Sequence, residues 1–336
     1  MKQEILQLSA KVPVMLMGAP GIGKTAVVSD FAKNISADLI DVRLSAETPG
    51  SFEGKDYVCP REGNLKKARS WWLQRLDRNK ENNTASILFF DEYTNAPDAL
   101  QQLAYSPFNE RRLHGVSFDY ELTGGSPGLY VFAAGNRVED ETGAREVVHA
   151  SKTRVFTLDF PVSANTWLKW AEKNDIHKKI RTFIFANPDA LLEKPSTGTA
   201  CPRGWVNLST AIKMGIDYKD AAKGTVNGAH LAKFCTFWGD SDTCPTISEI
   251  VSGRAKKPKA VHLTAYSVTL AFALKDDPNA AEHIPHVFRW IGGTSKESLV
   301  VFARYVTQLM PEVMVSDKEC REVLKPIAEK MVVKVL

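Results

Sequence analysis

The sequence predicts an α/β fold, in which a three-layer αβα core with a parallel sheet is followed by a helical region. Short apolar runs alternate with amphipathic or polar stretches up to about residue 160, which is typical of parallel strands covered on both faces by helices. The apolar runs are residues 12–17, 39–42, 87–90, 129–134 and 155–158. Beyond Pro161 the strand pattern fades, and most of the remaining chain has a helical pattern.

A glycine-rich loop follows the first apolar run. Residues 18–25 read GAPGIGKT and fit the phosphate-binding pattern G-x-x-x-x-G-K-[ST]. The run before the loop predicts a strand and residues 25–33 predict a helix, so phosphates would lie at a helix N-terminus. Lys24 would reach the β- and γ-phosphates of ATP, and the Thr25 hydroxyl would bind Mg²⁺. The residues expected to bind ATP are Ala19, Pro20, Gly21, Ile22, Gly23, Lys24, Thr25 and Ala26.

Polar residues also end two later apolar runs. Residues 87–92 read ILFFDE, so Asp91 and Glu92 would lie at the carboxyl edge of the sheet, where ligands bind in open α/β sheets. We expect Asp91 to support the Mg²⁺ through water and Glu92 to act as the general base toward the attacking water. Asn136 follows the run at 129–134 and would hold that water or touch the γ-phosphate; the alternative is an asparagine in a tight turn.

The composition is that of an ordinary globular protein, with 44% hydrophobic and 24% charged residues in a chain of 336. The net charge of +4 is too balanced to indicate nucleic acid or membrane as the main partner. No apolar stretch approaches the roughly 20 residues of a membrane span, and no secretion signal is apparent. The five cysteines are widely spread without a C-x-x-C pair, so we expect reduced thiols and a cytoplasmic location.

Together these segments resemble the AAA+ P-loop ATPases, and within them the MoxR-like group, over roughly residues 10–210. Three stretches carry the resemblance beyond the phosphate loop. They are the segment that follows ILFFDE (residues 93–115), the segment from the fourth to the fifth apolar run (residues 129–160), and CPRGW (residues 201–205).

The resemblance implies roles for four residues at the site. Glu92 is the catalytic carboxylate, Asn136 is sensor 1, and Arg203 is sensor 2 at the start of a lid helix. Arg154 is the arginine finger that completes the site of a neighbouring subunit. Thr153 before it and Val155 after it depart from the family pattern. The finger could therefore instead be Lys152 or Arg145.

The resemblance also implies three segments along the chain. Residues 1–161 would be the nucleotide-binding core, with a hairpin insertion near residues 110–128 that often faces a central pore in this family. Residues 162–252 would be a helical lid, and residues 253–336 a helical extension that belongs to the lid or binds a partner. A basic, proline-interrupted stretch at 253–260, GRAKKPKA, fits either an anion or nucleic-acid patch or a solvated linker.

The expected activity is ATP hydrolysis by an oligomeric motor or chaperone that remodels a protein partner, with ATP and Mg²⁺ as cofactors. The family default is a homo-hexameric ring, sometimes with a von Willebrand factor A-domain partner, and no membrane. Two alternatives remain open: a motor or loader that acts on nucleic acid, and a scaffold that assembles on binding ATP. The intact Glu92 disfavours the scaffold.

Overall fold

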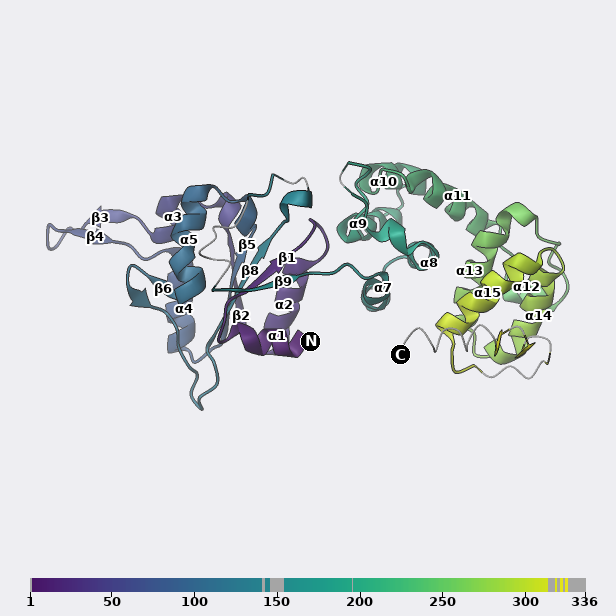
Figure 1. Ribbon diagram of the computed structural model, residues 1–336, viewed down its shortest axis with the longest axis horizontal. Helices are drawn as coiled ribbons and strands as arrows, with labels where there is room; N and C mark the ends of the chain where they lie inside the picture. Colours follow the sequence, from purple (N-terminus) through teal and green to yellow (C-terminus); the bar gives the residue numbers. More distant parts are fainter. Residues whose placement is uncertain are drawn as a thin grey trace. The chain divides into compact units, whose positions relative to one another are not determined.

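The computed structural model describes residues 2–140, 143–145, 154–194 and 196–313, together with residues 318, 321, 322, 324 and 325. The chain divides into two compact units (Figure 1). The first comprises Met1–Val162 and Cys201–Arg203, and the second comprises Ser163–Ala200 and Gly204–Leu336.

A five-stranded sheet forms the centre of the first unit, and its strand order is β2-β5-β8-β1-β9. Every neighbouring pair is parallel, so the parallel sheet predicted from the five apolar runs is confirmed. The strands are β1 (Val14–Met17), β2 (Asp38–Arg43), β5 (Ser86–Asp91), β8 (Leu129–Gly135) and β9 (Phe156–Asp159).

Alternate residues of the central strands bury opposite faces of the sheet. On β5, Ile87 and Phe89 belong to the core shared with α1 and α2, whereas Leu88 and Phe90 belong to the core shared with α3, α4 and α5. Both faces are therefore covered, which explains why this strand is apolar at consecutive positions and gives the three-layer arrangement. The helices are α1 (Lys2–Ser9), α2 (Lys24–Asn34), α3 (Pro49–Glu53), α4 (Trp71–Glu81) and α5 (Asp98–Glu110).

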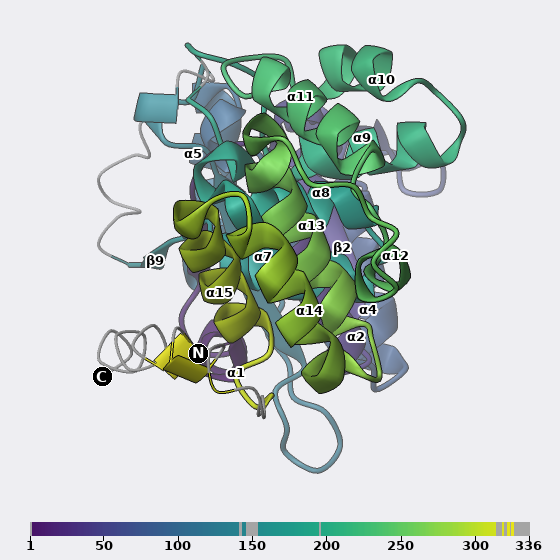
Figure 2. The same ribbon diagram turned by 90° about the vertical axis from the view of Figure 1, so that its right-hand side faces the viewer.

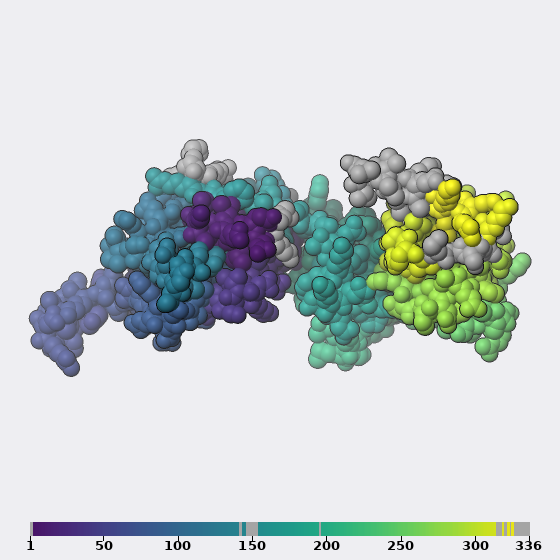
Figure 3. Space-filling view, turned by 90° about the horizontal axis from the view of Figure 1, so that it is seen from below, coloured from purple at the N-terminus to yellow at the C-terminus, as the bar shows by residue number. Residues whose placement is uncertain are grey.

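Two short antiparallel hairpins extend the first unit. The first, β3 (Asp56–Val58) with β4 (Leu65–Lys67), was not predicted from the sequence and protrudes from this unit in Figure 3. Within residues 110–128, β6 (Arg112–Leu113) pairs with β7 (Val116–Ser117). The side chains of Lys67 and His114 link the hairpins, with 3.4 Å between their nitrogens.

Apolar side chains on these hairpins are exposed to an unusual degree. Tyr57, Val58, Leu65 and Val116 are between 45% and 69% exposed. Arg111, in contrast, is buried, pairs with Asp119 at 2.9 Å and donates to the Ser9 carbonyl at 3.0 Å. It therefore stabilises the base of the second hairpin.

The second unit is helical among the residues that the structure describes. An aromatic cluster around Phe183, Trp205 and Phe234 forms one part of its core. In a second part of this core, helices α13, α14 and α15 pack together around Leu263, Phe288 and other apolar residues (Figure 2). The helices are α7 (Ala164–Lys173), α8 (Lys178–Ala186), α9 (Pro202–Lys213), α10 (Tyr218–Thr225), α11 (Leu231–Asp242), α12 (Ile247–Val251), α13 (Leu263–Lys275), α14 (Ala280–Gly292) and α15 (Lys296–Leu309). The first two residues of α9 belong to the first unit.

Across the described parts of both units, no helix has the length and apolar character needed to cross a membrane. Among those residues, none of the four cysteines (Cys59, Cys201, Cys235 and Cys244) is in a disulfide.

Candidate functional site

The glycine-rich loop lies between the end of β1 and the start of α2, as its sequence context predicts. Gly21 and Gly23 have φ values of 73° and 100°, a left-handed conformation that glycine adopts without steric cost. Gly23 is the N-cap of α2 and offers no side-chain cap to the helix. The first N–H groups of α2 are therefore directed at the loop, where they favour an anion such as phosphate.

Lys24 is buried at the inside of this loop. Its ammonium group donates to the Gly18 carbonyl at 2.6 Å, to the Ala19 carbonyl at 2.9 Å and to Asn136 Oδ1 at 3.0 Å. Burial lowers the pKa of Lys24 to about 8, although the negative charge of Asp91 opposes this shift. The amine is thus desolvated and fixed in position where phosphate oxygens would approach the loop.

Thr25 and Asp91 meet beside Lys24. The Thr25 hydroxyl donates to Asp91 Oδ2 at 2.8 Å, while the other carboxylate oxygen accepts the Glu92 N–H at 2.8 Å. A hydroxyl and a carboxylate held together are oxygen donors that suit Mg²⁺, which usually takes few protein ligands and completes its shell with water and phosphate. The pair therefore fits the metal. The described part of the chain contains no cluster of three or more His, Cys, Asp or Glu side chains arranged for a metal.

Glu92 follows Asp91 directly, but its carboxylate contacts Ser45 and Arg43, whereas that of Asp91 contacts Thr25. Its φ of 56° is left-handed, a conformation that is uncommon for a residue other than glycine. The Ser45 hydroxyl donates to one of its carboxylate oxygens, and Arg43 Nε lies 4.0 Å from the other. Arg43 is the last residue of β2, and Ser45 lies in the short 3-10 turn that follows it (Leu44–Ala46). The strand β2 is paired with β5 so that Arg43 lies opposite Asp91.

Asp41 is a further carboxylate near the site that the sequence analysis did not select. Burial raises its pKa, and the negative charge of Asp91 raises it further. Its Oδ1 atom is buried without a hydrogen-bond partner among the residues that the structure describes. The signal that could have identified Asp41 and Ser45 was the strand order, because β2 is adjacent to β5 in space but separated from it in the sequence.

Asn136 follows β8 and reaches Lys24 with its side-chain oxygen. Its amide nitrogen donates to Asn95 at 3.0 Å, and its backbone N–H donates to the Thr94 hydroxyl at 2.8 Å. These two bonds fix the direction of the side chain, so the residue does more than close a turn. The preceding Gly135 permits the close approach, because an added Cβ would lie 2.6 Å from a carbon of Thr94.

Arg203 belongs to the first unit together with Cys201. Its backbone N–H donates to the Gly21 carbonyl at 3.1 Å. A Cβ at Gly21 would lie 2.8 Å from the sulfur of Cys201, so this segment packs directly on the glycine-rich loop. The guanidinium charge of Arg203 contributes to lowering the pKa of Lys24, which places this cation in the electrostatic environment of the site.

Residues 13–154 match the family model of the AAA domain (dynein-related subfamily). This part of the chain has the AAA fold. The match begins just before β1 and ends just before β9, so it includes the glycine-rich loop, Asp91, Glu92 and Asn136. No curated protein matched the sequence.

Solved structures resemble the chain over most of its length. A candidate ATPase from Cytophaga hutchinsonii is 14% identical with a TM-score of 0.32, over 98% of this chain and 88% of its own. NtrX from Brucella abortus in complex with ADP is 14% identical with a TM-score of 0.38, over 92% and 67%. A variant of RuvB from Thermotoga maritima is 13% identical with a TM-score of 0.37, over 96% and 93%. At these scores the three similarities carry no argument about function.

The candidates for the arginine finger lie in different parts of the AAA domain. Arg154 donates to the Tyr105 hydroxyl at 2.7 Å and to Glu110 at 3.1 Å, near the end of α5. Arg145 donates to Asp98 at 2.7 Å, at the start of α5. These two ends of α5 are about 18 Å apart along the helix axis. Lys152, the third candidate, lies outside the described residues.

Arg154 is remote from the glycine-rich loop of its own chain. It precedes β9, in which Phe156 pairs with Val14 and Asp159 pairs with Met17. The loop follows Met17, so Arg154 lies at the opposite end of these parallel strands, roughly 15 Å away at 3.3 Å per residue. Any contact of Arg154 with the phosphates of ATP would therefore have to be made in another copy of the chain.

Proposed function

We propose that this chain binds ATP with Mg²⁺ and hydrolyses it at the carboxyl edge of the sheet in its AAA domain. One observation carries the proposal: two hydrogen-bonded pairs, Lys24 with Asn136 and Thr25 with Asp91, lie side by side at the end of the glycine-rich loop, since Lys24 and Thr25 are consecutive residues. The pairs Lys24–Asn136 and Thr25–Asp91 link residues 112 and 66 positions apart in the sequence. This arrangement was expected from the motifs, but it depends on the strand order that the fold supplies.

Each residue has a defined part in the proposed reaction. Lys24 and the first N–H groups of α2 bind the phosphates, and Glu92 accepts a proton from the attacking water. Asn136 orients that water or the γ-phosphate, and Arg203 adds positive charge beside the loop. The metal, held by Thr25 and Asp91, would supply further positive charge to the β- and γ-phosphates.

We further propose that ATP hydrolysis drives the remodelling of a protein partner by an oligomeric ring, as the MoxR-like resemblance implies. Two observations support this. Arg154 is exposed and remote from its own phosphate loop, as a residue that acts in a neighbouring subunit must be. The hairpins β3–β4 and β6–β7 also expose apolar side chains that could contact a protein partner. A hexamer and a von Willebrand factor A-domain partner remain proposals on the family pattern alone.

The test is steady-state ATP hydrolysis as a function of protein concentration, for the wild type and for Glu92→Gln. We expect a specific rate that rises with concentration, because the subunits share sites, and a loss of turnover in the variant with ATP binding retained. Glu282→Gln is the matched control, since Glu282 is exposed on α14 and should leave the rate unchanged.

Two other results would contradict parts of the proposal. A rate that does not depend on concentration would exclude a contribution from a neighbouring subunit. Tight ATP binding without turnover in the wild type would favour the nucleotide-gated scaffold.

A further inference from the structure

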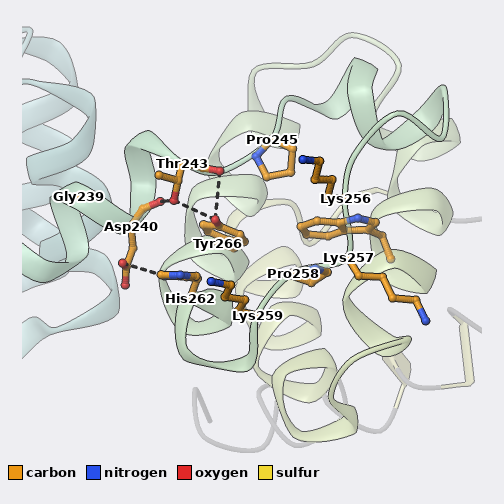
Figure 4. Close-up of a pocket in the computed structure, with 11 residues that line it drawn as sticks. Gly239, Asp240, Thr243, Pro245, Lys256, Lys257, Pro258, Lys259, His262 and Tyr266 are labelled. Atoms are coloured by element: carbon orange, nitrogen blue, oxygen red, sulfur yellow. Dashed lines mark hydrogen bonds and ion pairs between the residues drawn. The ribbon is translucent and has the colours of Figure 1, made fainter.

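A pocket of about 350 Å³ lies within the second unit (Figure 4). One side is formed by the end of α11 and the residues after it, including Asp240 and Thr243. The other sides are formed by residues 256–259, by Tyr266 on α13 and by Trp290 on α14. The basic stretch GRAKKPKA therefore lies along a pocket in the folded chain.

The pocket carries concentrated positive charge. Lys256, Lys257 and Lys259 line it and are exposed, and no carboxylate lies within 4.0 Å of their ammonium groups among the described residues. The acidic residue of the pocket, Asp240, already lies 2.9 Å from Nδ1 of His262 (Figure 4). Three ammonium groups are thus available to an anionic ligand.

Beside the lysines, aromatic rings form a flat wall. The rings of His262 and Tyr266 are inclined by 20° with centroids 5.7 Å apart, and those of Tyr266 and Trp290 by 21° with centroids 6.2 Å apart. Tyr266 is fixed because its hydroxyl donates to the Thr243 carbonyl at 3.0 Å. Trp290 also lines the pocket, and its indole N–H is buried without a hydrogen-bond partner among the described residues.

We propose that this pocket binds single-stranded nucleic acid, with a base against the aromatic wall and backbone phosphates on Lys256, Lys257 and Lys259. Aromatic faces beside a basic groove are the combination by which proteins hold single strands without strong sequence preference. An acidic protein segment would satisfy the lysines but would leave the aromatic wall without a role. A single nucleic-acid strand is therefore the ligand that accounts for both the lysines and the aromatic rings.

This inference goes beyond the proposed ATPase activity and is independent of it. The pocket consists only of residues from the second unit, and its occupation requires no hydrolysis. A binding assay in the Lys24→Ala background removes the phosphate-binding lysine of the AAA domain. An absence of nucleic-acid binding at the pocket would therefore not contradict the proposal that the AAA domain hydrolyses ATP.

The experiment is fluorescence anisotropy of a labelled oligothymidylate of about 12 nucleotides, a length within the usual site sizes for single strands, titrated with the full chain. We expect the triple variant Lys256→Ala, Lys257→Ala, Lys259→Ala to bind at least about tenfold more weakly. The slope of log K against log salt should be about −2 in the parent and near zero in the variant, because three phosphate contacts are lost. The charge-matched control removes three other exposed lysines of this unit, Lys219, Lys223 and Lys233, and should change affinity less than twofold.

A second pair of variants tests the aromatic wall. Trp290→Leu should weaken binding by about tenfold through loss of stacking, whereas Trp290→Phe keeps a ring and should retain most of the affinity. Circular dichroism of both Trp290 variants identifies any loss of folding. If they do not fold, the triple lysine variant still tests the proposal.

Three outcomes would overturn the proposal. The first is equal affinity in the parent and the triple lysine variant. The second is binding of a polyglutamate peptide of the same charge as tightly as the oligonucleotide, because the pocket would then recognise charge alone. The third is binding of thymidine monophosphate with no binding of the oligonucleotide, which would make the pocket a mononucleotide site.

Discussion

The hydroxyl of Ser45 donates a hydrogen bond to the carboxylate of Glu92, the residue that would accept a proton from the attacking water. Arg43, two residues earlier, holds the other oxygen of this carboxylate at 4.0 Å. Both contacts come from the end of β2 and are made at a residue with left-handed backbone geometry. The carboxylate is thus held toward β2 by neighbours that have no place in the phosphate-binding motif.

We expect Ser45→Ala to raise kcat for ATP hydrolysis by about three- to tenfold, with little change in KM. The lost hydrogen bond occupies an acceptor site on Glu92, and a general base must be free to approach the water that it deprotonates. Steady-state kinetics of the purified variant measure the effect. Ser51→Ala is a suitable control, because Ser51 also donates to a glutamate, Glu47, but does not contact Glu92. An unchanged or lower kcat in Ser45→Ala would show that this hydrogen bond does not restrain the base.

We expect the affinity for ATP to fall above about pH 8 because Lys24 loses its proton there. Burial lowers the pKa of Lys24 from 10.5 to about 8, and bound phosphates would raise it again by favouring the ammonium form. Between these two pKa values, binding takes up a proton, so Kd should rise up to about tenfold per pH unit. The measurement is Mg-ATP binding from pH 7 to 10 in the Glu92→Gln variant, which avoids hydrolysis.

Lys24→Arg is the control for this pH profile, because its guanidinium does not titrate in this range. The affinity of this variant for ATP should be lower than that of the wild type and should not change with pH in this range. Stability should change in the opposite direction to ATP affinity. The unfolded chain binds more protons than the folded chain between pH 8 and 10.5, so this group makes the free energy of unfolding rise with pH in that window. A wild-type Kd that stays constant up to pH 10 would contradict the assignment.

We expect Trp205→Ala to lower the free energy of unfolding of the second unit by about 3–5 kcal/mol. Trp205 is fully buried, packs against Phe183 and Phe234, and donates from its indole N–H to the Ala190 carbonyl at 2.9 Å. Removal leaves both a cavity and an unpaired carbonyl. Urea unfolding followed by circular dichroism measures the loss. Trp170→Ala, at a position 37% exposed, should cost much less, and equal losses would contradict this account.

The candidate site residues of the AAA domain could be selected from the sequence because the signals that mark them are local. The loop around Lys24 and the carboxylates at Asp91 and Glu92 are each specified by consecutive residues at the end of an apolar run. Their convergence followed from the rule that ligands bind at the carboxyl edge of a parallel sheet. Ser45 and Asp41 were missed because their relation to Asp91 depends on which strands are neighbours, and no local pattern gives that order.

The hairpin β3–β4 was missed for a different reason. Its strands are only three residues long and largely exposed, so they show neither a buried run nor a clear alternation. In the second unit, the helical pattern was evident but the packing was not. The sequence favoured a solvated linker over an anion or nucleic-acid patch for the basic stretch at 253–260, because its aromatic neighbours Tyr266 and Trp290 follow it at some distance in the chain.

The last prediction concerns which arginine acts between subunits. Arg145 is tied to the region of its own nucleotide site, because its N–H donates to the carbonyl of Thr94, and the Thr94 hydroxyl accepts from the backbone of Asn136. Arg154 is held near the far end of α5 instead, remote from the loop of its own chain. We therefore expect Arg154→Ala to lower kcat by about a thousandfold while ATP binding is retained. Arg145→Ala, the matched control, should lower kcat far less.

Mixing experiments separate a role between subunits from a structural one. A subunit with Arg154→Ala retains its own Glu92, and a subunit with Glu92→Gln retains its own Arg154. A mixture of these two inactive variants should therefore regain activity at interfaces where Glu92 of one subunit meets Arg154 of its neighbour. The ATPase rate of the mixture, compared with that of each variant alone, measures this complementation. A mixture that stays inactive, while Arg145→Ala with Glu92→Gln recovers, would transfer the finger role from Arg154 to Arg145.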